Sequence, residues 1–192
     1  MQIIIATDIH GVTDGVRALF ESFDPHQLRF LSPWDSDEHH YSTEQEAVKA
    51  FHAEQGLLRY QQKIAKVAGD APALLIGFSV GASAMWHYAS SEQCHGDSRA
   101  VMYYGSRIRD HLSLVPRCKS SLIFAEHESA FAPHLIVDQL RSSDRDCTLI
   151  ASTAHGFMNP HSPHFDSQET QRQLDYLRAI AQSLSPSLSH SL

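Results

Sequence analysis

The sequence has few of the features that mark secreted, membrane-spanning or nucleic-acid-binding proteins. It contains only three cysteines, widely spaced and in no metal or redox motif, so no disulfide framework is expected. No apolar run approaches the length of a membrane span, and the opening segment Met1–Ala6 is too short and has no basic flank for a signal sequence. The net charge is −7, and no run of lysine and arginine is present that could bind nucleic acid. We therefore expect a cytoplasmic protein without a membrane or nucleic-acid partner.

What the sequence does have is the composition of a globular protein. Hydrophobic residues make up 42% and charged residues 19% of the 192 positions, which is enough for the core of one domain. We expect this domain to span residues 1–184, followed by a Ser-rich, frayed tail over residues 185–192. There are fourteen histidines, but none of the motifs that place zinc ligands on a helix is present. We therefore predict neither a metal nor another cofactor.

Short apolar runs alternate with helical patterns along the chain. Runs of β-branched and apolar residues predict six strands: Gln2–Ala6, Leu28–Ser32, Ala73–Ile76, Arg99–Tyr104, Ser121–Ala125 and Cys147–Ala151. The segments between and after them predict helices: Asp14–Phe23, Ser42–Val67 with a break or bend at Gly56, Ala82–Ala89, Pro133–Leu140 and Ser167–Ser183. This alternation indicates an α/β fold, a compact and mostly parallel six-stranded sheet with helices on both faces. The connection after the fourth strand is too short for a cap domain.

The segment Gly77-Phe78-Ser79-Val80-Gly81 stands between a buried strand and a helix. This is the arrangement of a nucleophile elbow, a sharp turn that lifts a serine clear of the sheet. The turn crowds the positions two before and two after the serine, so Gly77 and Gly81 are the small residues that it requires. We predict Ser79 as the nucleophile and the backbone N–H of Val80 as a donor to the oxyanion.

A serine hydroxyl is a weak nucleophile and needs a general base within hydrogen-bond reach. His155 follows the last predicted strand, and an unperturbed imidazole, which titrates at about pH 6.5, can accept the serine proton. The acid that holds this histidine is one of two glutamates after the fifth strand. Glu128 is favoured because it lies further into the loop, and Glu126 is the alternative. The chain order nucleophile, acid, histidine is that of α/β-hydrolases.

The loop after the first strand carries the remaining candidates. We predict the N–H of Ile9 as the second oxyanion donor. Asp8 is expected to hold this loop or to contact the nucleophile, and His10 stands in a His-Gly pair of the kind often found at this place in hydrolases. The loops Trp34–Tyr41 and Gly105–Pro116 are expected to shape the pocket.

Three segments resemble dienelactone hydrolases. His155-Gly-Phe-Met-Asn159 is similar to the catalytic-histidine segment of that family, Asp8-Ile-His-Gly-Val12 to the loop that supplies an oxyanion N–H, and Phe124–Pro133 to the segment of the triad acid. The resemblance implies an α/β-hydrolase fold, hydrolysis of a small ester or lactone through an acyl-enzyme, and Glu128 as the acid. The chain departs from the family by having Ser79 for a cysteine, glutamate for the usual aspartate, and Asn159 in the region of the arginine that binds the substrate carboxylate.

Two other interpretations remain. Asp8-Ile-His10 also resembles the Asp-x-His pair with which calcineurin-like metallophosphoesterases bind metal after a first strand, although the further Gly-Asp and Gly-Asn-His segments of that family are absent. Alternatively, an α/β-hydrolase fold serves as a binding module without catalysis. Labelling by a serine-directed phosphonate would distinguish a hydrolase, whose partner is a small-molecule ester or lactone, from both.

Overall fold

The computed structural model describes residues 1–35 and 41–184, so the predicted tail lies outside the described residues. Six strands form one sheet in the order β2-β1-β3-β4-β5-β6, and every neighbouring pair is parallel. The strands are β1 (Gln2–Ala6), β2 (Leu28–Leu31), β3 (Ala73–Phe78), β4 (Arg99–Tyr103), β5 (Lys119–His127) and β6 (Asp146–Ala154). The α-helices are α1 (Asp14–Leu19), α2 (Glu44–Ala53), α3 (Gly56–Ala68), α4 (Val80–Ala89), α5 (Pro133–Ser142) and α6 (Ser167–Leu184). The predicted α/β fold is confirmed, and the sheet is entirely rather than mostly parallel.

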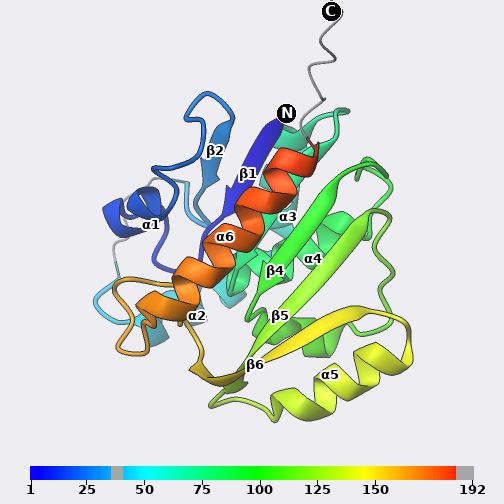
Figure 1. Cartoon of the computed structure of the whole chain (residues 1–192). Coiled ribbons are helices and arrows are strands. Elements are labelled where there is room, and N and C mark those ends of the chain that lie inside the picture. The colour runs from blue at the N-terminus through cyan, green and yellow to red at the C-terminus, as the bar shows by residue number, and fades with distance from the viewer. Residues whose placement is uncertain (36–40, 185–192) are drawn as a thin grey trace, which may run out of the picture.

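Helices cover both faces of the sheet (Figure 1). Successive residues of a strand point to opposite faces, so each central strand contributes to two separate clusters. Ile4 and Leu75 pack in the cluster formed with α2, α3, α4 and α5, whereas Ile5 and Ile76 pack in the cluster formed with α1 and α6. Burial on both faces explains why these strands read as continuous apolar runs. Within the described part of the chain, no helix is both long and apolar enough to cross a membrane.

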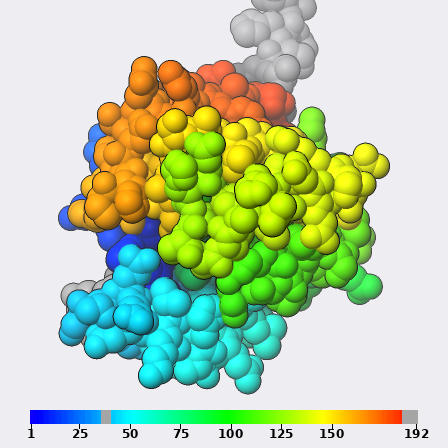
Figure 2. Space-filling view, turned by 90° about the horizontal axis from the view of Figure 1, so that it is seen from below, coloured from blue at the N-terminus to red at the C-terminus, as the bar shows by residue number. Residues whose placement is uncertain are grey.

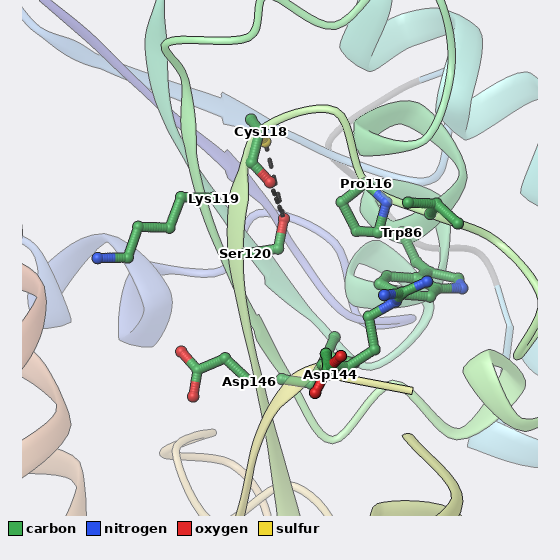
Figure 3. A pocket seen from close by; sticks show the side chains of 10 residues that line it. Trp86, Pro116, Cys118, Lys119, Ser120, Asp144 and Asp146 are labelled. Carbon is green, nitrogen blue, oxygen red and sulfur yellow. Dashed lines mark hydrogen bonds between the residues drawn. The ribbon is translucent and has the colours of Figure 1, made fainter. Parts of the chain in front are cut away.

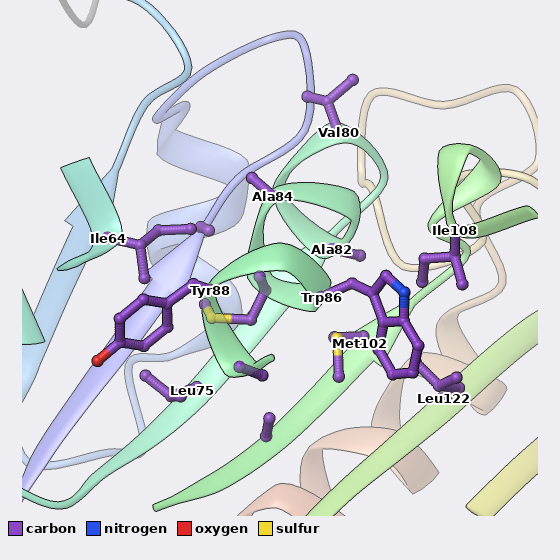
Figure 4. Packing of buried hydrophobic residues seen from close by; sticks show 14 of the residues in the cluster. Ile64, Leu75, Val80, Ala82, Ala84, Trp86, Tyr88, Met102, Ile108 and Leu122 are labelled. Atoms are coloured by element: carbon purple, nitrogen blue, oxygen red, sulfur yellow. The ribbon is translucent and has the colours of Figure 1, made fainter. Parts of the chain in front are cut away.

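Helix α4, which follows the elbow, lies at the centre of the larger cluster. Every residue of this helix except His87 is buried. Figure 4 shows Tyr88 directed toward Ile64 and Leu75, while Trp86 lies toward Met102 of the sheet. A helix that is apolar all round has to be enclosed, and this enclosure fixes the start of α4 and the serine before it.

Two of the predicted helices differ from the observed ones. α1 ends at Leu19 instead of continuing to Phe23, because the chain leaves the helix in tight turns in which the N–H groups of Phe20 and Phe23 bond to the carbonyl three residues before. The long helix predicted over residues 42–67 is two helices, α2 and α3. They are separated at Gln55, whose φ of 55° is left-handed, so the expected break lies one residue before Gly56.

The last two strands run further than predicted. β5 continues to His127 and β6 to Ala154, with an irregularity in their pairing between Ala125 and His127. Ser152, with φ 61°, lies in the same stretch of β6. These extensions place Glu126 inside a strand and bring His155 directly after β6 rather than four residues beyond it. Of Trp34–Tyr41, one of the two loops predicted to shape the pocket, residues 36–40 lie outside the described residues.

Candidate active site

Ser79 stands between β3 and α4 in a backbone conformation that non-glycine residues rarely adopt. Its φ is 53° and its ψ is −113°. Such a conformation costs on the order of 1–3 kcal/mol and persists only where the surroundings impose it. Here the Ser79 N–H donates to the carbonyl of Tyr103 at 3.0 Å, and its own carbonyl accepts from the N–H of Ser83 at 3.0 Å. The neighbouring strand and the helix together hold the turn.

The two glycines of the elbow are crowded by different parts of the molecule. A Cβ placed on Gly77 would lie 2.6 Å from the Cα of Ala82 in the following helix. A Cβ placed on Gly81 would lie 2.2 Å from the carbonyl oxygen of Ala6 and 2.5 Å from that of Thr7. Gly77 therefore permits the tight turn itself, and Gly81 permits the elbow to lie against the end of β1.

The structure brings Ser79, His155 and Glu128 into one chain of hydrogen bonds. Ser79 Oγ lies 2.9 Å from His155 Nε2, and His155 Nδ1 lies 2.9 Å from both carboxylate oxygens of Glu128. The Glu128 side chain is 3% exposed, whereas the His155 side chain is 32% exposed. The carboxylate is thus shielded from water, while part of the imidazole remains accessible. These residues come from three separate strand ends on the same edge of the sheet.

Figure 2 looks onto this edge, which lies at the bottom of Figure 1. Segments from the beginning of the chain (blue), from α2 (cyan) and from the loops after β5 and β6 (yellow-green and orange) meet there. The carboxyl ends of parallel strands are the usual place for a ligand site in open α/β sheets.

Glu126, the alternative acid, has a different role in the structure. It lies in β5 and its side chain accepts a hydrogen bond from the backbone N–H of Ser152 at 2.7 Å. A second contact, of 3.6 Å, joins it to the ring of His127. Glu126 thus supports the irregular pairing of β5 with β6, while Glu128 faces the imidazole.

The two predicted oxyanion donors follow neighbouring strands of the sheet, Val80 after β3 and Ile9 after β1. Val80 is the first residue of α4, so its N–H has no acceptor within the helix. Ile9 lies in a turn closed by a hydrogen bond of 3.1 Å from the N–H of Gly11 to the carbonyl of Asp8. His10 follows in this turn, and its ring lies 3.6 Å from the carboxylate of Glu44.

Asp8 is held by a residue that the sequence did not identify as functional. Its carboxylate accepts from the His10 N–H at 3.0 Å and from Asn159 Nδ2 at 2.7 Å. Both Asp8 and Asn159 are buried. Burial raises the pKa of the Asp8 carboxyl, although His10, Asn159 and His155 each act to lower it. Asn159 therefore joins the loop after β1 to the loop that carries His155. In the sequence, its position four residues after the histidine was the signal that could have identified it.

Tyr104 is a second residue that sequence analysis overlooked, since it was expected only as the end of a strand. It is buried, has φ 40°, and its ring meets the His155 ring edge-on with centroids 5.1 Å apart. Burial raises the pKa of its hydroxyl well above the ordinary value. A positive φ on a buried aromatic residue is an uncommon strain, and here it adjoins the candidate base.

The side chains of Asp8 and His10 each interact with other groups. The carboxylate of Asp8 is bonded to a backbone N–H and an amide, while the ring of His10 pairs with Glu44. Within residues 1–35 and 41–184, no three side chains of histidine, cysteine, aspartate or glutamate are grouped so that they could hold a metal ion.

No family model matches the chain. The uncharacterized protein YczH of Bacillus subtilis (strain 168) is 35% identical over 119 residues. This match covers 61% of the chain and 57% of YczH, so the chain matches little more than half the length of that relative.

Solved structures resemble this chain over nearly its whole length. A proposed dienelactone hydrolase from Klebsiella pneumoniae subsp. pneumoniae matches with a TM-score of 0.65 at 17% identity, covering 92% of this chain and 85% of that chain. A dienelactone hydrolase-like promiscuous phosphotriesterase from metagenomic libraries matches with a TM-score of 0.65 at 13% identity, with coverages of 95% and 86%. A proposed hydrolase of the α/β superfamily from Xanthomonas campestris pv. campestris matches with a TM-score of 0.62 at 13% identity, with coverages of 95% and 99%. At these identities the likeness shows the fold, and the fold is that of the α/β-hydrolases.

Proposed function

We propose that this protein is a serine hydrolase that cleaves a small carboxylic ester or lactone through an acyl-enzyme. The observation that carries the proposal is the 2.9 Å contact between Ser79 Oγ and His155 Nε2, made by a serine with φ 53°. In the proposed site the Nδ1–H of the neutral imidazole donates a hydrogen bond to the carboxylate of Glu128, so Nε2 is left as an acceptor facing the hydroxyl. A strained serine aimed at such an acceptor is the arrangement of an activated nucleophile.

In the first step Ser79 Oγ attacks the carbonyl carbon of the substrate, and its proton passes to His155 Nε2. The carbonyl oxygen becomes an oxyanion, which the N–H groups of Val80 and Ile9 stabilise by hydrogen bonds. Glu128 fixes the imidazole orientation and stabilises the imidazolium by its charge. When the tetrahedral intermediate collapses, the bond between the carbonyl carbon and the alcohol oxygen breaks, that oxygen takes the proton from His155, and Ser79 remains acylated. An ester releases its alcohol at this point, whereas the hydroxyl of an opened lactone stays attached to the acyl group.

In the second step water attacks the acyl carbon, and His155 Nε2 accepts a proton from it. Collapse of the second tetrahedral intermediate returns that proton to Ser79 Oγ and releases the carboxylic acid. The same atoms act in both steps with their acid and base roles exchanged.

The surroundings of the site favour a small-molecule substrate. The connection from β4 to β5 contains the 3-10 helix η1 (Ser106–Asp110), and residues 104–118 carry no inserted domain over the serine. The basic side chains of η1 are already paired, since Arg107 and Arg109 lie 3.2 Å and 3.8 Å from the carboxylate of Asp110. The connection from β4 to β5 thus supplies no cap that would have to move before an ester or lactone reaches Ser79.

The proposal is tested by the intact mass of the protein after treatment with a reactive fluorophosphonate. We expect one covalent adduct on the wild type and none on Ser79→Ala. Ser83→Ala is the matched control, because Ser83 is a buried serine of α4, one helical turn after Ser79, and its hydroxyl donates to the Ser79 carbonyl at 3.2 Å. That variant should keep the adduct.

Failure of the wild type to form an adduct would contradict the proposal and favour a binding module with the same fold. An adduct that survives Ser79→Ala would show that another residue is the nucleophile. A single adduct on Ser79 would justify assays with esters and lactones of varied acyl length.

A further inference from the structure

The turn that carries Ile9 is held by a side chain from the neighbouring strand connection. Trp34, which follows β2, donates its indole N–H to the carbonyl of Ile9 at 2.8 Å. Asp8 accepts from the N–H of His10 at 3.0 Å through its side chain and from the N–H of Gly11 at 3.1 Å through its carbonyl. Three hydrogen bonds therefore fix two consecutive peptide groups.

These bonds determine the direction of the Ile9 N–H. In a trans peptide the C=O and the N–H point to opposite sides. The carbonyl of Asp8 points into the turn toward Gly11, so the N–H of Ile9, which belongs to the same peptide, points out of it. The next peptide is held at both polar atoms, the Ile9 carbonyl by Trp34 and the His10 N–H by Asp8. Rotation of either peptide would break at least one of these bonds.

Trp34 is itself positioned by its surroundings. Its backbone N–H donates to Ser32 Oγ at 3.1 Å, and its carbonyl accepts from the ammonium group of Lys63. Its ring packs against Tyr41 and Phe51, with centroid distances of 5.0 Å and 6.2 Å. The indole N–H is thus presented to the turn by β2, α2 and α3 together.

The turn begins where β1 meets the nucleophile elbow. The carbonyls of Ala6 and Thr7 occupy the space that a side chain at Gly81 would need, and the Thr7 carbonyl accepts from the hydroxyl of Tyr60 at 3.1 Å. The start of the turn is therefore anchored to the elbow, and its direction beyond Thr7 depends on the bonds at Asp8 and Ile9. A donor held in advance loses no free energy to reorientation when charge develops on the substrate.

We propose that Trp34 is a positioning residue of the oxyanion hole, whose indole N–H fixes the Ile9 peptide so that the Ile9 N–H faces the reacting carbonyl. This inference rests on the proposed hydrolase function. According to this inference, Trp34 helps to stabilise the transition state but does not contribute to substrate binding.

The chain offers a matched control in its other tryptophan. Trp86 is fully buried and also donates its indole N–H to a backbone carbonyl, that of His111, at 2.9 Å. It lies in α4, beyond the elbow, and its partner carbonyl follows η1. Removal of either indole N–H by substitution with phenylalanine costs a hydrogen bond and some packing, but only Trp34 is bonded to the oxyanion loop.

The test compares Trp34→Phe, Trp34→His and Trp86→Phe in the hydrolysis of p-nitrophenyl acetate, with active sites counted by fluorophosphonate labelling. Trp34→Phe should lower kcat by about 10- to 100-fold, less than the loss of an oxyanion donor altogether, with KM changed by less than about twofold. Trp86→Phe should keep kcat within about twofold of the wild type, even if it lowers the melting temperature more than Trp34→Phe does.

Trp34→His separates the hydrogen bond from packing. Ring atom Nε2 of histidine superimposes on the indole Nε1 position, so this variant keeps a donor, whereas phenylalanine better replaces the lost apolar surface. Retention of more kcat by Trp34→His than by Trp34→Phe supports the inference. If Trp34→Phe does not fold, Trp34→His is compared with the wild type: a kcat within about threefold supports the inference, and a loss of about 10- to 100-fold overturns it. Equal kcat in Trp34→Phe and wild type, or a better Trp34→Phe than Trp34→His, overturns it. A wild type that neither binds fluorophosphonate nor hydrolyses any ester overturns the proposed function as well, which is a distinct result.

Discussion

The two ends of the sheet hold their polar side chains in different ways. At the carboxyl end, hydrogen bonds join residues that are far apart along the chain: Ser79 and His155 are separated by 76 positions, and Asp8 and Asn159 by 151. Glu128 and His155 are separated by 27. These side chains are buried or half-buried, and each carboxylate has donors directed at it.

At the amino end, a cavity of about 260 Å³ opens near the starts of β5 and β6 (Figure 3). Two of its polar side chains, Ser120 and Arg145, bond to close neighbours in the sequence. Ser120 donates to the carbonyl of Cys118 at 3.0 Å, and Arg145 donates to that of Ser143 at 2.7 Å. Lys119 and Asp144 are exposed. Asp146 connects the cavity to buried polar groups, since it accepts from Ser121, which in turn accepts from Arg99 at 2.7 Å, but the Asp146 side chain is itself 61% exposed.

This difference shows that the size of a hollow does not by itself mark a reactive site. A buried polar group costs free energy unless its partners are held in place, so a network built from distant segments has to be imposed by the fold. Polar groups that bond locally at a surface can adjust to substitution. The carboxyl end should therefore respond strongly to small chemical changes, and exposed side chains of the amino-end cavity, such as Lys119, should not.

The largest contrast is expected between the two glutamates after Phe124. Glu128→Gln should lower kcat/KM for an activated ester by about 10³- to 10⁴-fold, because an amide cannot hold the imidazole in the same tautomer or stabilise its charge. Glu126→Gln should change kcat/KM by less than about threefold, since its amide oxygen can still accept from the N–H of Ser152. Lys119→Ala, at the amino-end cavity, should have no effect beyond about twofold. The opposite ranking of the two glutamates would refute the assignment of the acid.

An intermediate effect is expected for the stability of the elbow. Gly81→Ala places a Cβ 2.2 Å from the carbonyl of Ala6, and we expect it to lower the free energy of unfolding by about 3 kcal/mol. Gly96→Ala is the control, because its Cβ would come no nearer than 3.8 Å to the carbonyl of Arg117. That change should stay within about 1 kcal/mol. Urea unfolding measures both, and equal losses would show that β1 can move away from the elbow.

The smallest effect is expected at the entrance to the first loop. A hydrogen bond to Glu44 raises the pKa of His10, so the pair should stabilise the fold fully below the unfolded-state pKa of about 6.5 and lose this effect as the pH rises through the folded-state pKa. The side chains are 34% and 62% exposed, so we expect a few tenths of a kcal/mol at most. Glu44→Gln should be less stable than the wild type at about pH 5.5 and equally stable at about pH 8. A difference that persists at the higher pH would assign the effect to another contact of Glu44.

Much of the fold could be predicted because its signals are local. Continuous apolar runs marked the six strands, and their alternation with helical patterns marked the parallel sheet. The ends of elements were less well predicted. The break at Gln55 depends on a left-handed backbone in a residue with no such preference, and the extension of β6 to Ala154 depends on its pairing with β5.

The candidate site likewise contains residues that could be predicted from the sequence and residues that could not. Ser79, Glu128 and His155 were predicted because each follows a recognisable strand in a known order, and the structure places them within hydrogen-bond distance. Asn159 and Tyr104 were missed because neither the position of Asn159 four residues after His155 nor that of Tyr104 at the end of a strand indicates what the side chain contacts. Their importance comes from loops that meet only after the sheet has formed.

The sequence by itself determined the alternation of strands and helices, the edge of the sheet at which the polar residues gather, and the residue types of the elbow. These follow from hydrophobic periodicity and from the small side chains that a sharp turn requires. Only the tertiary structure decided which of two glutamates faces His155, that Asn159 holds Asp8, and that Trp34 bonds to the Ile9 carbonyl. The reason is physical: each of these depends on a distance of about 3 Å between segments whose separation is set by the packing of the sheet and its helices, and no local pattern encodes that distance.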